Sequence, residues 1–386
     1  MKKFKTKRLW VYLFPALMDL SVAAVLIFSA IRAVEFGAKA FVVGILGSVW
    51  GITYFVSSLI LSRIITRKNS TTFMLFSCVS FAFIGLFFGF FKSLYSLFLL
   101  LIIGGLFASF FFVGFQLFME HSSGTISSRA SALYTLSWSA GMAFGSLAEG
   151  FLMNRGFLWA RLPILLPAVV VIFGILVSQK LNNSKDLYEK AQENNIPDTF
   201  LKVYAKIAWI EIFTVTFVTV GIRYLLPKMT ISFFNFSHTS AASAVFLFFV
   251  LQAMSGYVSC FFRFLSYNLK AHNLLKLLAA MGLIVPVLFP YDFSVFLSVC
   301  CLGIYSGHAF WASVFYAIND RRRAGFGVGF NESLVGISSV LGPFLFGIML
   351  NSGVLQFLIF PWLVFILSSF FQYGVVKKNR VIPEVP

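Results

Sequence analysis

The stretch QKLNNSKDLYEKAQENNIPDTFLKVYAK, residues 179–206, is the one long polar run in a chain that is otherwise almost continuously apolar. It lies at the midpoint of the 386 residues. A polar segment between two apolar halves predicts a water-exposed bridge between two membrane-embedded bundles. We expect a short surface helix at 184–195, because Ser184 is a suitable N-cap; a flexible loop is the alternative.

The composition places the whole chain in a membrane. Hydrophobic residues make up 59% and charged residues only 11%, and the mean hydropathy is +0.91. Soluble domains are normally about 25% charged, so this chain is too apolar for a water-soluble globule. The four cysteines lie within apolar runs without metal-ligand spacing, so we expect core packing and neither metal nor cofactor.

Runs of about 20 apolar residues, the length that crosses a bilayer as a helix, recur along the chain. They predict an all-α membrane protein with twelve spans, at roughly 9–31, 41–61, 71–91, 94–120, 131–153, 159–178, 207–226, 240–262, 274–290, 293–318, 325–350 and 354–376. The predicted organisation is a six-helix bundle at 1–178, a cytoplasmic linker at 179–206, and a second six-helix bundle with a short cytoplasmic tail at 207–386.

The basic residues predict the orientation. Roughly three quarters of the 30 lysines and arginines fall in the loops on the side of both termini, if Lys270 and Lys276 are counted in the loop before the ninth span. Loops rich in Lys and Arg stay in the cytoplasm, so both termini are expected there. Orientation and contact with anionic lipids explain the net charge of +17 without nucleic acid. Without a targeting signal, we expect a plasma or bacterial inner membrane.

The two halves also repeat each other. GSLAEGFLMNRG (145–156) and GPFLFGIMLNSG (342–353) lie about half the chain apart and share three glycines and one asparagine in register. Parallel repeats of six helices are one architecture of secondary transporters. Paired glycines at Gly47/Gly51, Gly85/Gly89, Gly141/Gly145 and Gly303/Gly307 predict close approach between helices.

These features together resemble the major facilitator superfamily over the whole chain. The family's motif between the second and third helices is similar to SLILSRIITRK at 58–68. Arg63, Arg67 and Lys68 match it in type, whereas Ser58 replaces its glycine and Ser62 its aspartate. The resemblance implies a central cavity lined by the first, fourth, seventh and tenth helices and flanked by the second, fifth, eighth and eleventh.

Ionisable residues within spans are costly, by at least about 2.5–3.5 kcal/mol at the centre, and are therefore functional candidates. Asp19 lies roughly 16 Å past Arg8 along a helix, near the midplane. A carboxyl there suits a proton carrier; helix packing is the alternative. Glu332 lies roughly 13 Å past Arg323 and is a second candidate for the proton path, with a polar clamp between the halves as the alternative.

Three further charged residues have simpler explanations beside the functional one. Glu149 is expected toward the outer end of its helix, paired with Arg32 or Arg155. Glu211 is expected near the inner interface as a solvated first-turn acid. Arg223 is expected near the outer end of the seventh span, with its side chain reaching the interface, and anion binding is the functional alternative.

Uncharged and weakly basic candidates complete the predicted substrate or proton path. His308, about midway in its span, suits a proton relay or anion binding, with a hydrogen-bonded core histidine as the alternative. The polar and aromatic candidates are Gln116, Gln252, Trp138 and Trp311, with packing as the alternative for the tryptophans.

The sequence therefore predicts a secondary transporter that moves a small solute by alternating access and couples it to protons, with efflux of an amphiphilic compound favoured. No nucleophile set and no phosphate-binding loop occurs, which argues against an enzyme or an ATP-driven pump. An uncoupled facilitator, a sugar or metabolite importer, and a non-transporting sensor or scaffold stay open. We expect a monomer whose partners are the solute, protons and lipids.

Overall fold

The computed structural model describes residues 9–66, 68–122, 127–181, 198–262, 265, 268–319 and 324–379. Within these ranges the chain forms twelve helices of 17 residues or more and no strand. They are α1 (Leu13–Glu35), α2 (Ala40–Ile64), α3 (Ser70–Leu86), α4 (Leu94–Ser122), α5 (Ser127–Leu152), α7 (Leu162–Leu181), α8 (Asp198–Phe234), α9 (His238–Ser259), α10 (Leu269–Leu288), α11 (Asp292–Asn319), α12 (Ala324–Ser352) and α13 (Val354–Asn379). Short turns flank them at η1 (Leu9–Tyr12), η2 (Phe88–Phe90), η3 (Met153–Arg155) and α6 (Phe157–Ala160).

Most of these helices can cross a membrane on length and composition. In the described residues ten helices are long and apolar enough, and α3 is a shorter apolar helix. α5 is not among the ten, since it carries many serines together with Arg129 and Glu149. It packs on α1 within its bundle and on α9 of the other bundle. These neighbours shield it from lipid, so polar side chains are tolerated on this helix. The predicted all-α architecture of twelve helices is confirmed.

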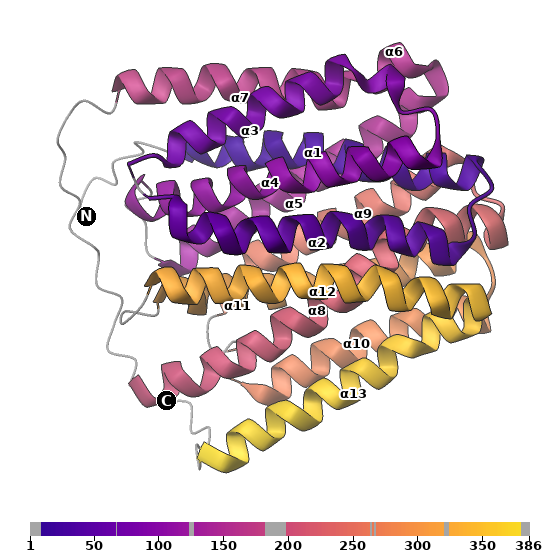
Figure 1. Ribbon diagram of the computed structural model, residues 1–386. Coiled ribbons are helices and arrows are strands. Elements are labelled where there is room, and N and C mark those ends of the chain that lie inside the picture. The colour runs from indigo at the N-terminus through magenta and orange to yellow at the C-terminus, as the bar shows by residue number, and fades with distance from the viewer. Residues whose placement is uncertain are drawn as a thin grey trace.

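The helices form two bundles of six. α1 to α7 make the N-terminal bundle, indigo to magenta in Figure 1, and α8 to α13 make the C-terminal bundle, red to yellow. The bundles meet along two long contacts, α2 with α12 and α5 with α9, supplemented by α1 with α8 and α5 with α11. We call this interface the seam. Figure 1 also shows the start of α1 and the end of α13 at the same end of the molecule, which carries the α2–α3 connection. We name this the α2–α3 end and the opposite one the α1–α2 end.

The middle of the chain differs in detail from the prediction. The seventh span, expected at 207–226, is α8, which runs from Asp198 to Phe234. α8 therefore includes the last part of the expected linker. The surface helix expected at 184–195 lies outside the described residues, and the domain limits stay a prediction.

Large apolar side chains cover the outside of the bundles. Phe173, Leu363 and Phe370 are more than half exposed, as are many others on the outward faces of their helices. Such exposure is stable only where lipid replaces water. The described part of the chain is therefore a multi-pass membrane protein.

Glycines allow the closest helix contacts. A Cβ on Gly51 would lie 2.5 Å from the carbonyl oxygen of Ser339, and one on Gly141 would lie 2.0 Å from that of Ala16. Gly303 and Gly307 lie equally close to the backbone of α9. The predicted close approaches are confirmed for these glycine pairs. The prediction is wrong at Gly89, where a Cβ would meet nothing within 4 Å because the residue follows the end of α3.

Candidate transport site

Asp19 lies on the buried face of α1 at the seam. Its side chain is 5% exposed, and its Oδ2 atom has no hydrogen-bond partner in the described residues. It lies roughly 15 Å along the helix axis from Leu9, which is near the midplane of a bilayer about 30 Å thick. A buried carboxyl without hydrogen bonds is uncommon in structural positions, because packing roles usually come with partners.

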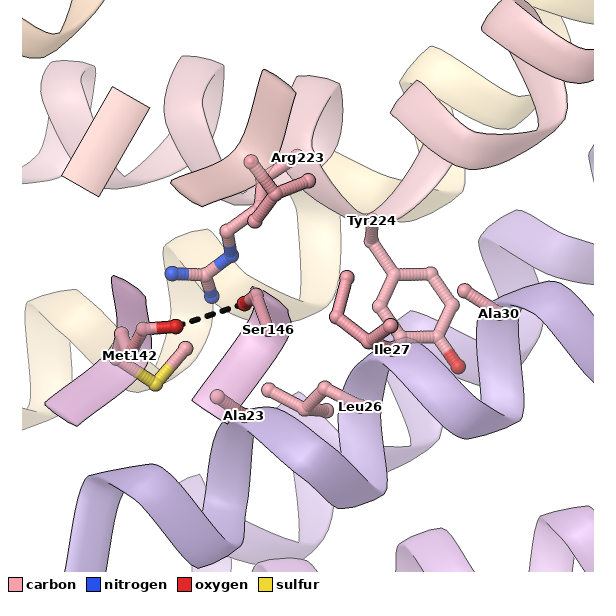
Figure 2. Close-up of a pocket in the computed structure, with 9 residues that line it drawn as sticks. Ala23, Leu26, Ile27, Ala30, Met142, Ser146, Arg223 and Tyr224 are labelled. Carbon is pink, nitrogen blue, oxygen red and sulfur yellow. Dashed lines mark hydrogen bonds between the residues drawn. The ribbon is translucent and has the colours of Figure 1, made fainter. Parts of the chain in front are cut away.

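Arg223 is the basic residue whose charge acts on Asp19. The expectation that Arg223 lies at the outer end of its helix is wrong, because α8 continues to Phe234, roughly 16 Å further along. The residue is partly buried, and Figure 2 shows its guanidinium pointing away from α8 towards Ser146 and Met142 of α5. The guanidinium carbon lies 5.1 Å from the centre of the Phe249 ring. Arg223 thus crosses the seam near its middle.

Glu332 forms a second group of contacts across the seam. Tyr54 donates a hydrogen bond to its Oε2 at 3.0 Å, and the Gln116 amide donates one to its Oε1 at 2.9 Å. The same amide lies 3.3 Å from the hydroxyl of Tyr134. We call these four residues the Glu332 cluster. They join α2, α4 and α5 of one bundle to α12 of the other.

Asp19 lies within electrostatic range of two members of the Glu332 cluster. The side chains of Tyr54 and Tyr134 lie within electrostatic range of both Asp19 and Glu332. The two acids that the sequence favoured for the proton path therefore lie around one pair of tyrosines. Tyr54 is a member that sequence reasoning missed, since it is one of 13 tyrosines and no pattern singles it out.

Gln252 makes another polar contact across the seam. Its amide donates to the Ser139 hydroxyl of α5 at 2.7 Å, and the Ser306 hydroxyl of α11 donates to its oxygen at 2.5 Å. Trp138 lies nearby on α5, edge-on to Phe310 with ring centres 5.0 Å apart. Both candidates therefore lie at the seam, where they hold α5 against α9 and α11.

Trp311 and His308 occupy buried positions on α11. The indole nitrogen of Trp311 donates to the carbonyl of Ser128 at 3.1 Å and joins α11 to the start of α5. The side chain is fully buried, so it lines no open cavity in this structure. The Nδ1 atom of His308 lies 3.0 Å from the Ser259 hydroxyl, and its ring packs 5.1 Å from that of His272. His308 thus belongs to the interior of the C-terminal bundle.

Glu211 is not a solvated acid at the start of a helix. α8 begins at Asp198, so Glu211 lies well inside the helix, where it is fully buried. It pairs with Lys276 at 3.0 Å and accepts a hydrogen bond from Gln372. Lys276 is likewise buried within α10, so its assignment to a loop is wrong. Because α8, α10 and α13 supply this group, it lies within one bundle and away from the Glu332 cluster.

Glu149 does not form the expected ion pair. Arg32 pairs with Glu35 instead, and Arg155 lies over the ring of Phe151 at 4.5 Å. Glu149 is fully buried, and neither of its carboxyl oxygens has a hydrogen-bond partner in the described residues. The next residue, Gly150, packs against Ala242 of α9, and the Glu149 side chain lies in the interior of the protein.

The α2–α3 connection carries part of the predicted loop motif. Arg63 and Lys68 are exposed, whereas Arg67 lies outside the described residues. Asn69 closes the turn, because its side-chain oxygen accepts from the Thr66 amide at 2.6 Å and its amide donates to the Ile64 carbonyl at 3.1 Å. This polar turn fixes the end of α2 without the aspartate of the motif.

The bundles touch at both ends of the seam. Trp311 and Ser128 meet at the α2–α3 end, and Asn154 donates to Thr239 at 3.1 Å at the α1–α2 end. Two pockets adjoin Arg223, and each has room for about one water molecule. In the described residues the bundles are thus in contact at both ends of the seam, and the two pockets beside Arg223 are too small for an organic solute.

Two six-helix bundles with ionisable side chains buried at their seam define a membrane transporter of the two-bundle class. The chain belongs to the Major Facilitator Superfamily, whose family model matches residues 9–343. As a member of this family, the protein is a membrane transporter and not an enzyme.

Solved structures agree with this assignment. A bacterial homologue of the human lysosomal transporter Spinster, in an inward-facing and occupied conformation, is similar with a TM-score of 0.65 and 13% identity, covering 99% of this chain and 100% of that one. The human organic anion transporter MFSD10 (TETRAN) is similar with a TM-score of 0.65 and 14% identity, covering 94% of this chain and 98% of that one. The nucleoside transporter NupG is similar with a TM-score of 0.63 and 14% identity, covering 95% of this chain and 98% of that one. At such low identity these likenesses show the fold alone. No curated protein sequence matches the chain.

Proposed function

We propose that this transporter moves a small amphiphilic solute by alternating access and couples the movement to protons through Asp19 and Glu332. The observation that carries the proposal is the shared environment of the two acids, one from each bundle, around Tyr54 and Tyr134. A protonation change at either acid alters the charge at the contact between the bundles. Proton coupling requires that proton binding changes the preferred position of one bundle relative to the other.

Glu332 supplies the conformational part of the proposed cycle. When it is ionised, it accepts hydrogen bonds from Tyr54 and Gln116 across the seam. Hydrogen bonds to a charged group contribute about 1.5–3 kcal/mol each, more than those to a neutral one. Protonation of Glu332 weakens both, and the α2–α3 end of the seam is then freer to open.

Asp19 is the proton carrier in the proposed cycle. Its carboxyl is buried within electrostatic range of Arg223 and makes no hydrogen bond through Oδ2, so a proton there alters the charge balance of the seam directly. We keep efflux of an amphiphilic compound as the favoured function, because the apolar side chains that line the seam suit such a solute. The lining residues include Leu26, Met142 and Val245.

The orientation follows from the charges at the two ends. Arg63, Arg129 and Lys270 are exposed at the α2–α3 end, and Lys377 and Lys378 end α13 there. We propose that this end, with both termini, faces the cytoplasm of a cell that carries the protein as a monomer in its plasma or inner membrane.

The test uses the purified protein in liposomes with an imposed pH gradient and a panel of anionic, neutral and cationic solutes. The wild type is expected to accumulate at least one solute in response to the gradient. Asp19→Asn should lose gradient-driven accumulation but keep solute exchange at equal pH, because the asparagine has nearly the same shape and binds no proton. Asp292→Asn, at an exposed acid in the first turn of α11, is the matched control and should behave as wild type.

Three results would contradict the proposal. If Asp19→Asn and Glu332→Gln both accumulate solute as wild type does, protons do not couple through these acids. Solute movement that ignores the gradient in the wild type would identify an uncoupled facilitator. Failure to move any solute class would support a non-transporting sensor or scaffold.

A further inference from the structure

Arg223 is a positive charge at the middle of the seam without a direct partner. Within the described part of the chain it makes no hydrogen bond and lies in no ion pair, and its contact is the face of the Phe249 ring. The charge of Asp19 acts on it from beyond ion-pair distance. A guanidinium has five N–H donors in a planar fork, and none of those of Arg223 meets an acceptor among the described residues.

The surroundings of Arg223 are mostly apolar on both sides, with Ser146, Tyr224 and Thr219 as the polar side chains among them. One pocket is bordered by α1, α5, α8 and α9, with Leu26, Met142 and Val245 among its walls, and Figure 2 shows the guanidinium directed into it. The second pocket is bordered by Phe248, Val299 and Leu302. An unpaired charge among such side chains is costly, and a bidentate anion is the partner that the guanidinium geometry fits best.

We propose that Arg223 binds the anionic head group of a small organic acid, whose apolar part lies against α1, α5 and α9, and that this anion binds together with a proton on Asp19. The inference rests on the proposed transport function and names its substrate class. A carboxylate, sulfonate or phosphate head group would each satisfy the fork of Arg223.

The coupling follows from the charges around Asp19. From the elements that pack on α1, the groups in electrostatic range are Arg223 on α8, Tyr54 on α2 and Tyr134 on α5; the described residues of α4 and α7 add none. Ionised Asp19 partly neutralises Arg223 and repels a second anion. A proton on Asp19 removes this competition, and by reciprocity a bound anion favours the proton.

Proton and anion therefore move in the same direction. One proton and one monoanion cross together, so the step carries no net charge. The gradients of both then set the direction of transport, and a cell that accumulates such an acid would export it. This symport differs from an antiport in which solute and proton compete for the same carboxyl.

The binding test measures thermal unfolding of the purified full-length protein over concentration series of straight-chain carboxylates from acetate to decanoate, at pH 6 and pH 8. The corresponding neutral amides are the ligand controls. At least one carboxylate should stabilise the wild type more than its amide does, with an apparent affinity about tenfold higher at pH 6. Arg223→Gln should abolish this difference, while Arg155→Gln, at an exposed arginine, should retain it.

Two more variants separate the anion site from the proton link. Arg223→Lys keeps the charge but loses the fork, so carboxylate affinity should fall about tenfold without being abolished. This variant also covers the case in which Arg223→Gln fails to fold. Asp19→Asn should bind carboxylates equally at pH 6 and pH 8, and as tightly as the wild type does at pH 6.

The anion site is overturned if no carboxylate stabilises the wild type beyond its amide, or if Arg223→Lys and Arg223→Gln bind as wild type. The symport is overturned if carboxylate affinity in the wild type is independent of pH, or if Asp19→Asn keeps the pH dependence. Gradient-driven movement of a neutral solute in liposomes, without carboxylate binding, would overturn this inference while the proposed transport function stands. Carboxylate binding without movement of any solute would support the anion site while contradicting the proposed transport function.

Discussion

Lys276 and Glu211 show how single residues stabilise charge inside a helical bundle. The ammonium group of Lys276 contacts the Glu211 carboxylate at 3.0 Å, the Gln372 oxygen at 2.6 Å and the Ser368 hydroxyl at 3.1 Å. All of its three donors thus have partners, and the group is neutral as a whole. Such pairing makes burial of a charge tolerable in lipid. Arg223, at the seam, has no comparable set of partners, and this contrast separates a structural charge from a candidate binding group.

Removal of Lys276 tests the structural role of this ion pair. Lys276→Met leaves Glu211 buried without a countercharge, and we expect it to lower the free energy of unfolding by about 3–5 kcal/mol. Chemical or thermal unfolding in detergent measures the change. The double variant Glu211→Gln/Lys276→Met should recover most of the loss, because neither group is then charged.

Lys270→Met is the matched control, since Lys270 is exposed on the same helix. It should unfold as wild type does. A Lys276→Met protein with unchanged stability would show that the pair contributes nothing to the fold.

At the scale of elements, backbone contact between helices depends on glycine. α11 lies against α9 so closely that a Cβ on Gly307 would come 2.1 Å from the carbonyl oxygen of Gln252 and 2.6 Å from the amide nitrogen of Gly256. These neighbours are backbone atoms, which cannot move aside as a flexible side chain can. The same close contact sets the side chain of Gln252 between Ser139 and Ser306. The packing of two helices thus positions a polar bridge across the seam.

The substitution Gly307→Ala tests this contact. We expect α11 to shift away from α9 and the free energy of unfolding to fall by about 1–3 kcal/mol, as overpacking generally costs. Gly374→Ala on α13 is the control, because a Cβ there meets nothing within 4 Å. Equal unfolding temperatures for the two variants would disprove the close contact.

At the scale of the whole molecule, the bundles are joined at both ends of the seam. The α2–α3 end is closed by Trp311 on Ser128, and the α1–α2 end by Asn154 on Thr239 and by His238, whose Nδ1 lies 3.7 Å from Glu35. Opening of either end of the seam requires that these contacts separate. Alternating access then requires that the two ends open in turn.

A disulfide across the α1–α2 end tests this requirement. Asn154 and Thr239 are in side-chain contact at the surface and belong to different bundles. The pair Asn154→Cys/Thr239→Cys should cross-link on oxidation and abolish solute movement in liposomes, and reduction should restore it. Mobility on a denaturing gel reports the cross-link after cleavage in the linker. The single variants are the controls, and full transport by the cross-linked protein would contradict opening at this end.

Much of the fold follows from the sequence, because the physics of lipid acts on each span by itself. A segment in hydrocarbon must satisfy its own backbone hydrogen bonds, so composition and length alone predict helices. Their number and the division of the chain at its polar middle follow in the same way. The glycine pairs Gly141/Gly145 and Gly303/Gly307 could also be read as contact positions, since small residues have few other uses on a membrane helix.

The local sequence was a poor guide to the surroundings of the charged residues. Asp19 and Glu332 could be selected as candidates because an acid in a span is costly wherever it lies. The partners of such groups come from helices far away in the chain: Lys276 for Glu211, and Tyr54 and Gln116 for Glu332. The extension of α8 to Phe234, which moves Arg223 from the interface to the middle of the seam, also depends on packing against other helices.

The sequence by itself therefore determined that this protein is a bundle of membrane helices with two similar halves, since transfer from water to lipid is a property of each segment. Only the tertiary structure decided which buried charges are paired, which lie at the seam, and that Arg223 lies among mostly apolar side chains without a hydrogen-bond or ion-pair partner in the described residues. The physical reason is that electrostatic and hydrogen-bond energies depend on the distance between atoms in space, which the order of residues along the chain does not fix.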